Sequence, residues 1–231
     1  LFPAQVLLET VAYIRGFLTR QAFDGPIASA ALHYAIGQDL MARYPGCETH
    51  SVVACAAAMG VPLYTSSPGD SSIGMNLAAH ELLGGGGCLI DSNRDVNEVA
   101  AIILDGTRNG CLILGGGSPK NFYLQGQPTL WEIYGIPKGG NDYFVQITTD
   151  QAVWGGLSGA TPSEAVSWGK INPGMLPDTV VTYCDSTIAF PILCEYVVSS
   201  EHSRRQPRRL MDRRGEMMAE LARQARARRP T

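Results

Sequence analysis

Short apolar segments alternate with amphipathic stretches along this chain, and each apolar segment ends in a loop of small or polar residues. The segments that resemble strands are residues 61–65, 88–91, 111–114, 143–149 and 180–183. Apolar residues at helical spacing occupy residues 4–20, 33–44, 73–83 and 95–104, with Asn93 or Asp95 as the expected cap of the last helix. Residues 51–59 fit a strand or a helix. The alternation predicts an α/β fold with a Rossmann-like parallel sheet flanked by helices.

The loops after the strand-like segments are the expected ligand-binding loops, because parallel sheets bind ligands at the carboxyl ends of their strands. They span residues 66–70, 115–119, 148–150 and 185–186. Glycine admits a pyrophosphate close to the backbone, helix N-termini favour anions, and acids accept hydrogen bonds from ribose hydroxyls. The chain has no G-x-G-x-x-G motif, so these loops indicate a nucleotide site without the usual dinucleotide fingerprint.

Charge is distributed unevenly along the 231 residues. Residues 201–231 hold ten of the 18 Lys and Arg residues and four of the 21 acidic residues, which leaves a net charge of −9 on residues 1–200. An acidic body would attract cationic small molecules such as polyamines, although the same charge also serves ordinary solubility. We expect the Arg-rich end to be a solvated terminal helix, and it lacks the interleaved aromatic residues typical of nucleic-acid binding.

Composition narrows the class of protein. With 45% hydrophobic and 17% charged residues, the chain has enough apolar material for the core of one domain or one large lobe. No apolar run reaches the ~18 residues of a membrane-spanning helix and no secretory signal is evident, so we expect a cytoplasmic protein. The six cysteines form no C-x-x-C pair and are expected to be reduced and buried. Neither they nor the four histidines show zinc-ligand spacing.

Lysine is rare in this chain, which contains Lys120, Lys138 and Lys170. Lys170 follows Trp168 in a mostly apolar stretch. Partial desolvation beside an indole would lower the pKa of its amine and leave it available as a nucleophile toward an imine or carbonyl carbon. From the residues alone, the plainer interpretation is favoured: a surface lysine beside a tryptophan that belongs to the core.

Residues 158–170, Ser-Gly-Ala-Thr-Pro-Ser-Glu-Ala-Val-Ser-Trp-Gly-Lys, closely resemble the active-site signature of deoxyhypusine synthases. Further landmarks of that family follow the same order at residues 70–74, 114–120, 147–149, 183–186 and 190–191. The resemblance covers residues 1–198 and implies a deoxyhypusine synthase-type NAD-binding fold. We therefore expect residues 1–200 to be the C-terminal catalytic part of one family domain, and residues 201–231 to be a tail.

The resemblance also implies an activity. Deoxyhypusine synthases are homotetramers with active sites at subunit interfaces, and they use NAD to oxidise spermidine and transfer its aminobutyl group through an enzyme lysine to an acceptor amine. Lys170 would be the imine-forming lysine, with Trp168 along the alkyl chain of the donor and Glu164 at an amine. The positions that match NAD-contacting residues of the family are Asp70, Gly116, Thr149, Asp150, Asp185 and Ser186.

Three residues depart from the pattern of the eukaryotic family members. Met75 and Leu157 stand where aspartates are expected, and Asn121 stands where a histidine is expected. These positions match residues that hold or deprotonate spermidine, and a desolvated ammonium group without a partner is costly. The chain thus resembles a divergent, bacterial deoxyhypusine synthase-like branch with a different amine donor or acceptor, such as a small amine in homospermidine formation. The family's N-terminal NAD-binding loops have no counterpart in these residues.

Three functions stay open at this stage. The first is an NAD-dependent aminoalkyl transferase that works through Lys170. The second is a non-catalytic paralogue that stabilises or activates a partner subunit, which the three substitutions favour and the retained Glu164, Trp168 and Lys170 oppose. The third is nucleic-acid binding through residues 201–231, which predicts salt-dependent binding that disappears with that segment. The sequence does not specify the amine donor or acceptor.

Overall fold

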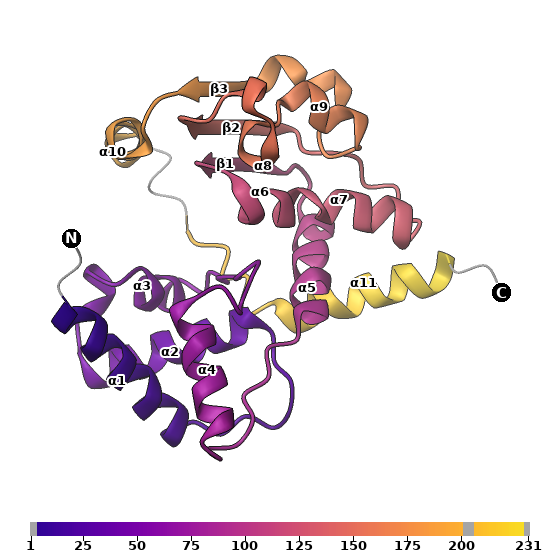
Figure 1. The fold of residues 1–231 in the computed structure, drawn as a ribbon. Helices are drawn as coiled ribbons and strands as arrows, with labels where there is room; N and C mark the ends of the chain where they lie inside the picture. Colours follow the sequence, from indigo (N-terminus) through magenta and orange to yellow (C-terminus); the bar gives the residue numbers. More distant parts are fainter. Residues whose placement is uncertain (1–3, 201–205, 229–231) are drawn as a thin grey trace. The chain divides into compact units, whose positions relative to one another are not determined.

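The computed structural model describes residues 4–200 and 206–228, which form two compact units (Figure 1). Among the described residues, the first unit comprises residues 4–95 with 208–212, and the second comprises residues 96–200 and 206–207 with 213–228. The boundary between them falls within helix α5 (Ser92–Asp105). These two units do not test the predicted boundary at residue 200 between the family domain and the tail, which stays a prediction.

The first unit is helical. Its elements are α1 (Ala4–Arg20), α2 (Ser29–Arg43), the 3-10 turn η1 (Cys47–Thr49), α3 (Val52–Ala58), α4 (Ser72–Leu82) and the start of α5. Ser51 and Ser71 begin α3 and α4, because the hydroxyl of each accepts a hydrogen bond from the backbone N–H three residues later. The core forms where Ile14, Phe17 and Leu18 of α1 pack with α2, as the apolar spacing of residues 4–20 predicts.

Two segments predicted as strands in this unit are not strands. Residues 61–65 have no partner strand, and side chains of Ser29 and His33 hold their backbone with contacts of 3.0 and 2.8 Å. Residues 88–91 contribute a single isolated bridge. Residues 51–59, which fitted either element, contain α3. An apolar run becomes a strand only where another strand lies beside it, and the described part of this unit offers no such ladder.

The second unit contains a three-stranded parallel sheet in the order β1-β2-β3. The strands are β1 (Gly110–Leu114), β2 (Tyr143–Thr148) and β3 (Thr179–Tyr183), and they point the same way in Figure 1. Each lies within one residue of the predicted segments at 111–114, 143–149 and 180–183, so the predicted parallel α/β fold is confirmed. The other elements are α6 (Gly117–Leu124), α7 (Gly126–Pro128), the π-helix η2 (Thr129–Ile133), η3 (Ala152–Trp154), α8 (Gly156–Gly159), α9 (Pro162–Ser167), η4 (Pro173–Asp178), α10 (Ser186–Ser199) and α11 (Arg214–Arg228).

The core of the second unit joins the sheet to helices α6 and α9. Ile113 of β1 and Phe144 of β2 cluster with Leu124 of α6, Ala165 of α9 and Ile171. All five are less than 10% exposed. This packing holds the segment that carries the signature residues against the middle of the sheet.

The start of α5 is capped by a residue that the sequence pattern did not indicate. The carboxylate of Asp91 accepts a hydrogen bond from the Asn93 amide at 2.9 Å. The predicted caps, Asn93 and Asp95, are wrong, because Asn93 is the donor and Asp95 lies inside the helix. Asp95 is 1% exposed and accepts a hydrogen bond of 2.7 Å from the Ser29 amide, so it ties α5 to α2.

The Arg-rich end is not a solvated helix along its whole length, which corrects the expectation. Met217 and Leu221 of α11 are each 4% exposed and form a short apolar stripe that the many arginines obscure. Arg213 donates two hydrogen bonds, of 2.8 and 3.1 Å, to the carboxylate of Asp105 in α5. Helix α11 is thus part of the second unit, while residues 201–205 and 229–231 of the predicted tail lie outside the described residues.

The variant Met217→Ala is expected to lower the free energy of unfolding by about 2 kcal/mol, because truncating a buried methionine leaves a cavity. The half-buried neighbour Met218 is the matched control, and Met218→Ala should cost less than about 1 kcal/mol. Denaturant titration followed by circular dichroism measures both values. Equal losses in the two variants would contradict the packing of α11.

Within the described ranges, no helix is both long and apolar enough to cross a membrane. The six cysteines are free thiols. The expectation that they are buried is wrong, since Cys55 is exposed and the other five are half-buried. Cys55 lies on α3, where the buried positions are taken by Ala54 and Ala57 instead.

Candidate active site

The carboxyl ends of the three strands meet at one edge of the sheet, and each leads into a predicted ligand loop. Hydrogen bonds of 2.8 and 3.1 Å from the amides of Gly115 and Cys184 to carbonyls of β2 continue the ladder into these loops. Five of the six predicted cofactor residues therefore lie along this edge, while Asp70 belongs to the first unit, in the turn before α4. The five are Gly116, Thr149, Asp150, Asp185 and Ser186.

Local hydrogen bonds shape two of these loops. The carboxylate of Asp185 accepts hydrogen bonds from the hydroxyl and the amide of Thr187, at 2.7 and 2.8 Å, and thereby caps α10. These hydrogen bonds lower the pKa of Asp185. The hydroxyl of Thr148 accepts a hydrogen bond from the Asp150 amide at 3.1 Å. An ionised, exposed Asp185 retains lone pairs that can accept a hydrogen bond from a ribose hydroxyl.

The glycine triplet at residues 115–117 links β1 to α6. Gly115 and Gly117 have φ angles of +75° and +70°, which favour glycine. A Cβ on Gly116 would lie 2.6 Å from Cα of Ser158, so two backbone segments touch there. Gly116 starts α6 without a side-chain cap, which leaves backbone N–H groups to meet an anion. The residues present thus fit the pyrophosphate of a dinucleotide.

The variant Gly116→Ala is expected to weaken dinucleotide binding and to lower the free energy of unfolding by about 2 kcal/mol, because the added methyl group overpacks the contact with Ser158. Gly174→Ala is the control, since a Cβ there would meet only a side-chain oxygen of Asn172, at 3.6 Å. Calorimetric titration and thermal unfolding measure the two effects. Wild-type binding by Gly116→Ala would show that this contact has room to relax.

Helix α9 and a glycine turn place Lys170. Thr161 caps α9 by accepting a hydrogen bond from the Glu164 amide at 3.2 Å. Gly169 ends the helix with a φ angle of +65°, and a Cβ there would lie 2.7 Å from the indole nitrogen of Trp131. The Lys170 amide then donates to the carbonyl of Ala165 at 3.0 Å. The sequence Trp-Gly-Lys is therefore a helix stop that directs the lysine back toward the sheet.

The amine of Lys170 lies near Asn121 and Trp168. Its Nζ donates to Oδ1 of Asn121 at 2.8 Å and is 5.8 Å from the centroid of the Trp168 ring. Desolvation lowers the pKa of this amine, while the negative charge of Glu164 opposes the shift. Trp168 is 60% exposed, so the interpretation that it belongs to the core is wrong. Helix α9 buries Ala165 instead.

The three lysines differ in how fully their amines are hydrogen-bonded. Lys120 is 6% exposed, and its Nζ donates to Oε1 of Gln146 and to the carbonyls of Ser158 and Ala160, at 3.0, 3.3 and 2.7 Å. Lys138 donates to two carbonyls at the end of α5. Lys170 makes one hydrogen bond among the described residues, and it is to a neutral amide. Although burial also lowers the pKa of Lys120, its three N–H groups are all engaged. Among the three lysines, Lys170 therefore has the amine with the fewest hydrogen bonds in the described structure.

Helix α6 connects Lys170 with the loops at the edge of the sheet. The backbone after Lys170 lies beside the start of β2, where Ile171 forms a bridge with Asn141. Helix α6 begins at the other end of the strands, at the edge where their carboxyl ends meet. Asn121 is the fifth residue of α6, about 6 Å along the helix axis. The amine of Lys170 thus meets α6 roughly one turn from the glycine triplet.

The structure brings together only some of the predicted substrate residues. Asn121 and Trp168 lie at the amine of Lys170, and Glu164 is exposed in the first turn of α9. Leu157 is 47% exposed and precedes Ser158, the residue against the glycine triplet. Met75, 64% exposed on α4, belongs to the first unit.

Three polar residues that the sequence analysis did not single out as site residues hold this segment. Asn141, Gln146 and Lys120 are 0%, 1% and 6% exposed, and each bonds to the backbone of residues 158–170. The sequence could have indicated the role of Gln146, because it is a polar residue on the buried face of an apolar strand. It could not have indicated that of Asn141, since the Gly-Gly-Asn-Asp context is typical of an exposed turn.

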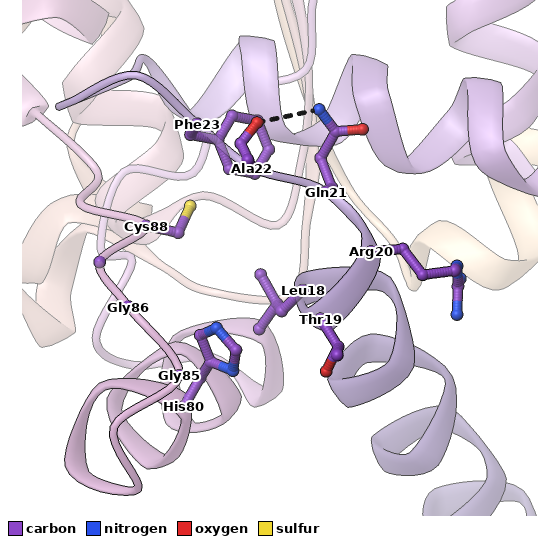
Figure 2. Close-up of a pocket in the computed structure, with 11 residues that line it drawn as sticks. Leu18, Thr19, Arg20, Gln21, Ala22, Phe23, His80, Gly85, Gly86 and Cys88 are labelled. Carbon is purple, nitrogen blue, oxygen red and sulfur yellow. Dashed lines mark hydrogen bonds between the residues drawn. The ribbon is translucent and has the colours of Figure 1, made fainter.

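A separate cavity of about 250 Å³ lies in the first unit, between the end of α1 and the glycine run at residues 84–87 (Figure 2). Its lining includes Leu18, His80 and Cys88, and the Gln21 side chain donates to the carbonyl of Ala22 there. Burial raises the pKa of the Cys88 thiol, which keeps it protonated. None of the predicted site residues lines this cavity.

Comparisons with known proteins agree with the signature. The family model of deoxyhypusine synthase matches residues 7–197. A deoxyhypusine synthase-like protein of Nostoc punctiforme is 48% identical over 230 residues, covering 96% of this chain and 58% of that protein. The corresponding protein of Thermosynechococcus vestitus is 49% identical over 233 residues, covering 96% and 57%. A probable deoxyhypusine synthase 2 of Methanosarcina acetivorans is 38% identical over 175 residues, covering 76% and 49%. The chain spans between about half and three fifths of the length of these relatives.

Proposed function

The chain belongs to the deoxyhypusine synthase family, and on that premise we propose that it is the catalytic part of an NAD-dependent transferase of aminoalkyl groups. The proposed donor is a polyamine, whose aminobutyl-type group passes through an imine on Lys170. The acceptor is a protein lysine, as in deoxyhypusine formation, or a small amine, as in homospermidine formation. The proposed assembly is a cytoplasmic homotetramer with active sites at subunit interfaces.

The observation that carries this proposal is the state of the Lys170 amine. Only a neutral amine has the lone pair that attacks an imine carbon, and desolvation lowers the pKa of this amine. Its hydrogen bond to Oδ1 of Asn121 fixes one N–H without supplying a negative charge that would hold the proton. The exposed face of Trp168 beside the amine suits the alkyl chain of a donor and a cationic amine.

In the proposed transfer step, the imine carbon of the donor exchanges its amine for Lys170, with no change in oxidation state. The lone pair of the Lys170 amine forms a bond to the imine carbon of the oxidised donor, and the bond from that carbon to the departing amine breaks. Starting from the protonated imine, one proton passes from Nζ to the departing nitrogen, which leaves as a neutral amine. The new imine on Lys170 carries the positive charge, which the exposed carboxylate of Glu164 favours. The acceptor amine then displaces Lys170 by the same exchange and restores the free lysine.

The cofactor residues are proposed from the edge of the sheet. Bound NAD would supply hydride transfer, which oxidises the donor amine and reduces the final imine. The backbone of Gly116 and the start of α6 would hold the pyrophosphate. Hydroxyls and carboxylates along this edge that suit the remaining hydroxyl groups of the cofactor belong to Thr149, Asp150, Asp185 and Ser186. Asp70 is proposed from the family resemblance alone.

Chemical trapping tests the function. The full-length protein is incubated with NAD and putrescine, spermidine or agmatine, reduced with borohydride, and digested for mass spectrometry. We expect a stable adduct on Lys170, with an added mass that identifies the donor. No adduct with any amine, in a protein that binds NAD, would instead support the non-catalytic partner subunit.

Restoring the two expected aspartates tests the choice of donor. The double variant Met75→Asp with Leu157→Asp should lower KM for spermidine about tenfold, since a charge-assisted hydrogen bond contributes roughly 1.5–3 kcal/mol. The double variant with asparagine at both positions is the control, because it has the same shape without the charge. Steady-state kinetics compares the two. Identical KM values would place the ammonium groups of the donor elsewhere.

A further inference from the structure

The backbone of Lys170 is held by a buried asparagine. The carbonyl oxygen of Lys170 accepts two hydrogen bonds from Asn141, one from its amide and one from its side-chain Nδ2, each 3.0 Å long. The carbonyl of Asn141 in turn accepts a hydrogen bond of 3.1 Å from the Asn172 amide. Asn141 is 0% exposed. Three hydrogen bonds thus join this one residue to the segment that begins at the lysine.

A tyrosine of α6 fixes the side chain of Asn141. The hydroxyl of Tyr123 donates to Oδ1 of Asn141 at 2.8 Å, so the amide group must present its Nδ2 donor to Lys170. Burial raises the pKa of Tyr123, which keeps its hydroxyl a donor. The backbone before Asn141 packs closely against the residue after Lys170, because a Cβ on Gly140 would lie 2.4 Å from the carbonyl carbon of Ile171.

The same helix holds both ends of the lysine. Asn121 of α6 accepts the hydrogen bond from its amine, and Tyr123 of α6 holds its carbonyl through Asn141. A lysine side chain has four rotatable methylene groups, so its amine has a defined position only when its backbone is also fixed. Misplacing a reacting atom by about 1 Å can cost up to roughly 100-fold in rate.

We propose that Tyr123 and Asn141 are positioning residues, which fix the Lys170 backbone so that its amine meets Asn121 and the donor imine at a reactive distance. The inference rests on the proposed function of Lys170 as the imine-forming residue. It assigns to the pair an effect on the chemical step through Lys170, beyond an effect on stability. Neither residue touches the donor in this role.

Tyr123→Phe is the test variant, because it removes one hydroxyl and preserves the shape of the ring. Tyr134→Phe is the matched control, since Tyr134 also donates its hydroxyl to the side-chain oxygen of an asparagine, Asn97, in the same unit. We expect similar small losses of thermal stability in both variants. In Tyr123→Phe alone, the rate of adduct formation on Lys170 at saturating amine should fall about tenfold, with KM for the amine unchanged.

A second readout needs no turnover. The pH dependence of Lys170 modification by a general amine reagent, trinitrobenzenesulfonate, reports the pKa of its amine. A lysine released from its fixed position becomes better solvated, so its pKa should rise toward the ordinary value in Tyr123→Phe and in Asn141→Ala. The charged groups around the amine, Glu164 and Lys120, are the same in these variants and in the wild type.

The outcomes separate this inference from the proposed function. If Tyr123→Phe matches Tyr134→Phe in kcat and in the pH profile of Lys170, the positioning role is wrong. If the wild type itself forms no adduct on Lys170, the proposed function fails, and a wild-type pH profile in Tyr123→Phe would then also overturn the positioning role. Should Asn141→Ala fail to fold, the Tyr123→Phe comparison decides alone.

Discussion

The variant Lys170→Ala is expected to abolish aminoalkyl transfer and borohydride trapping, by at least about a thousandfold, because it removes the amine that forms the imine and the Lys120 amine is held by three hydrogen bonds. Lys170→Arg should be equally inactive, since a guanidinium keeps the charge but offers no neutral amine. The fold should survive both changes. The side chain makes a single hydrogen bond, to Asn121, so its loss should change the free energy of unfolding by about 1 kcal/mol.

The matched control for this prediction is Lys138→Arg, which changes another lysine of the same unit in the same way. Lys138 donates to backbone carbonyls at the end of α5, and an arginine can do the same. The control should retain wild-type activity. Transfer by Lys170→Arg at more than a few per cent of the wild-type rate, measured with the same preparation of amine and NAD, would overturn the covalent mechanism.

The second large effect is expected from Lys120→Met, which should lower the free energy of unfolding by about 3 kcal/mol. Methionine has a similar length but no donor, so Oε1 of Gln146 and the carbonyl of Ala160 lose the hydrogen bond from Nζ in a buried site. The carbonyl of Ser158 also loses Nζ but keeps the hydrogen bond from Nε2 of Gln146. Because residues 158–160 lead into α9, transfer activity should fall together with stability.

Lys138→Met is the control for that measurement. Lys138 is half-buried, and water can replace its amine at the two carbonyls at the end of α5. The free energy of unfolding should therefore fall by about 1 kcal/mol, with full activity. Chemical denaturation and steady-state kinetics follow both variants. A Lys120→Met protein as stable as Lys138→Met would mean that water satisfies Oε1 of Gln146 and the carbonyl of Ala160.

The strands show where sequence patterns are sufficient. The segments at 111–114, 143–149 and 180–183 became β1, β2 and β3, because they lie beside one another and pair. The segments at 61–65 and 88–91 have the same apolar character, but side chains of α2 and a single bridge hold them instead. A strand needs a neighbour, and residue composition along a segment does not state whether one is present.

In the candidate site, too, some features could be predicted from the sequence and others could not. Placing five cofactor positions at one edge followed from the parallel sheet alone, because the carboxyl ends of parallel strands coincide. The position of Trp168 did not follow, since an indole is compatible with a core or with a surface, and it is 60% exposed. The apolar stripe of α11 was visible in the spacing of Met217 and Leu221, but the surrounding arginines hid its packing.

By itself, the sequence determined the family, the parallel α/β unit and the signature that singles out Lys170 among three lysines. Only the tertiary structure decided what each of these amines contacts. Lys170 meets Asn121 across 49 positions of the chain, and Lys120 meets Gln146 across 26. Such contacts depend on how α6 packs over the sheet, so no local pattern encodes them. Desolvation and hydrogen bonding, which set the reactivity of an amine, arise from that packing.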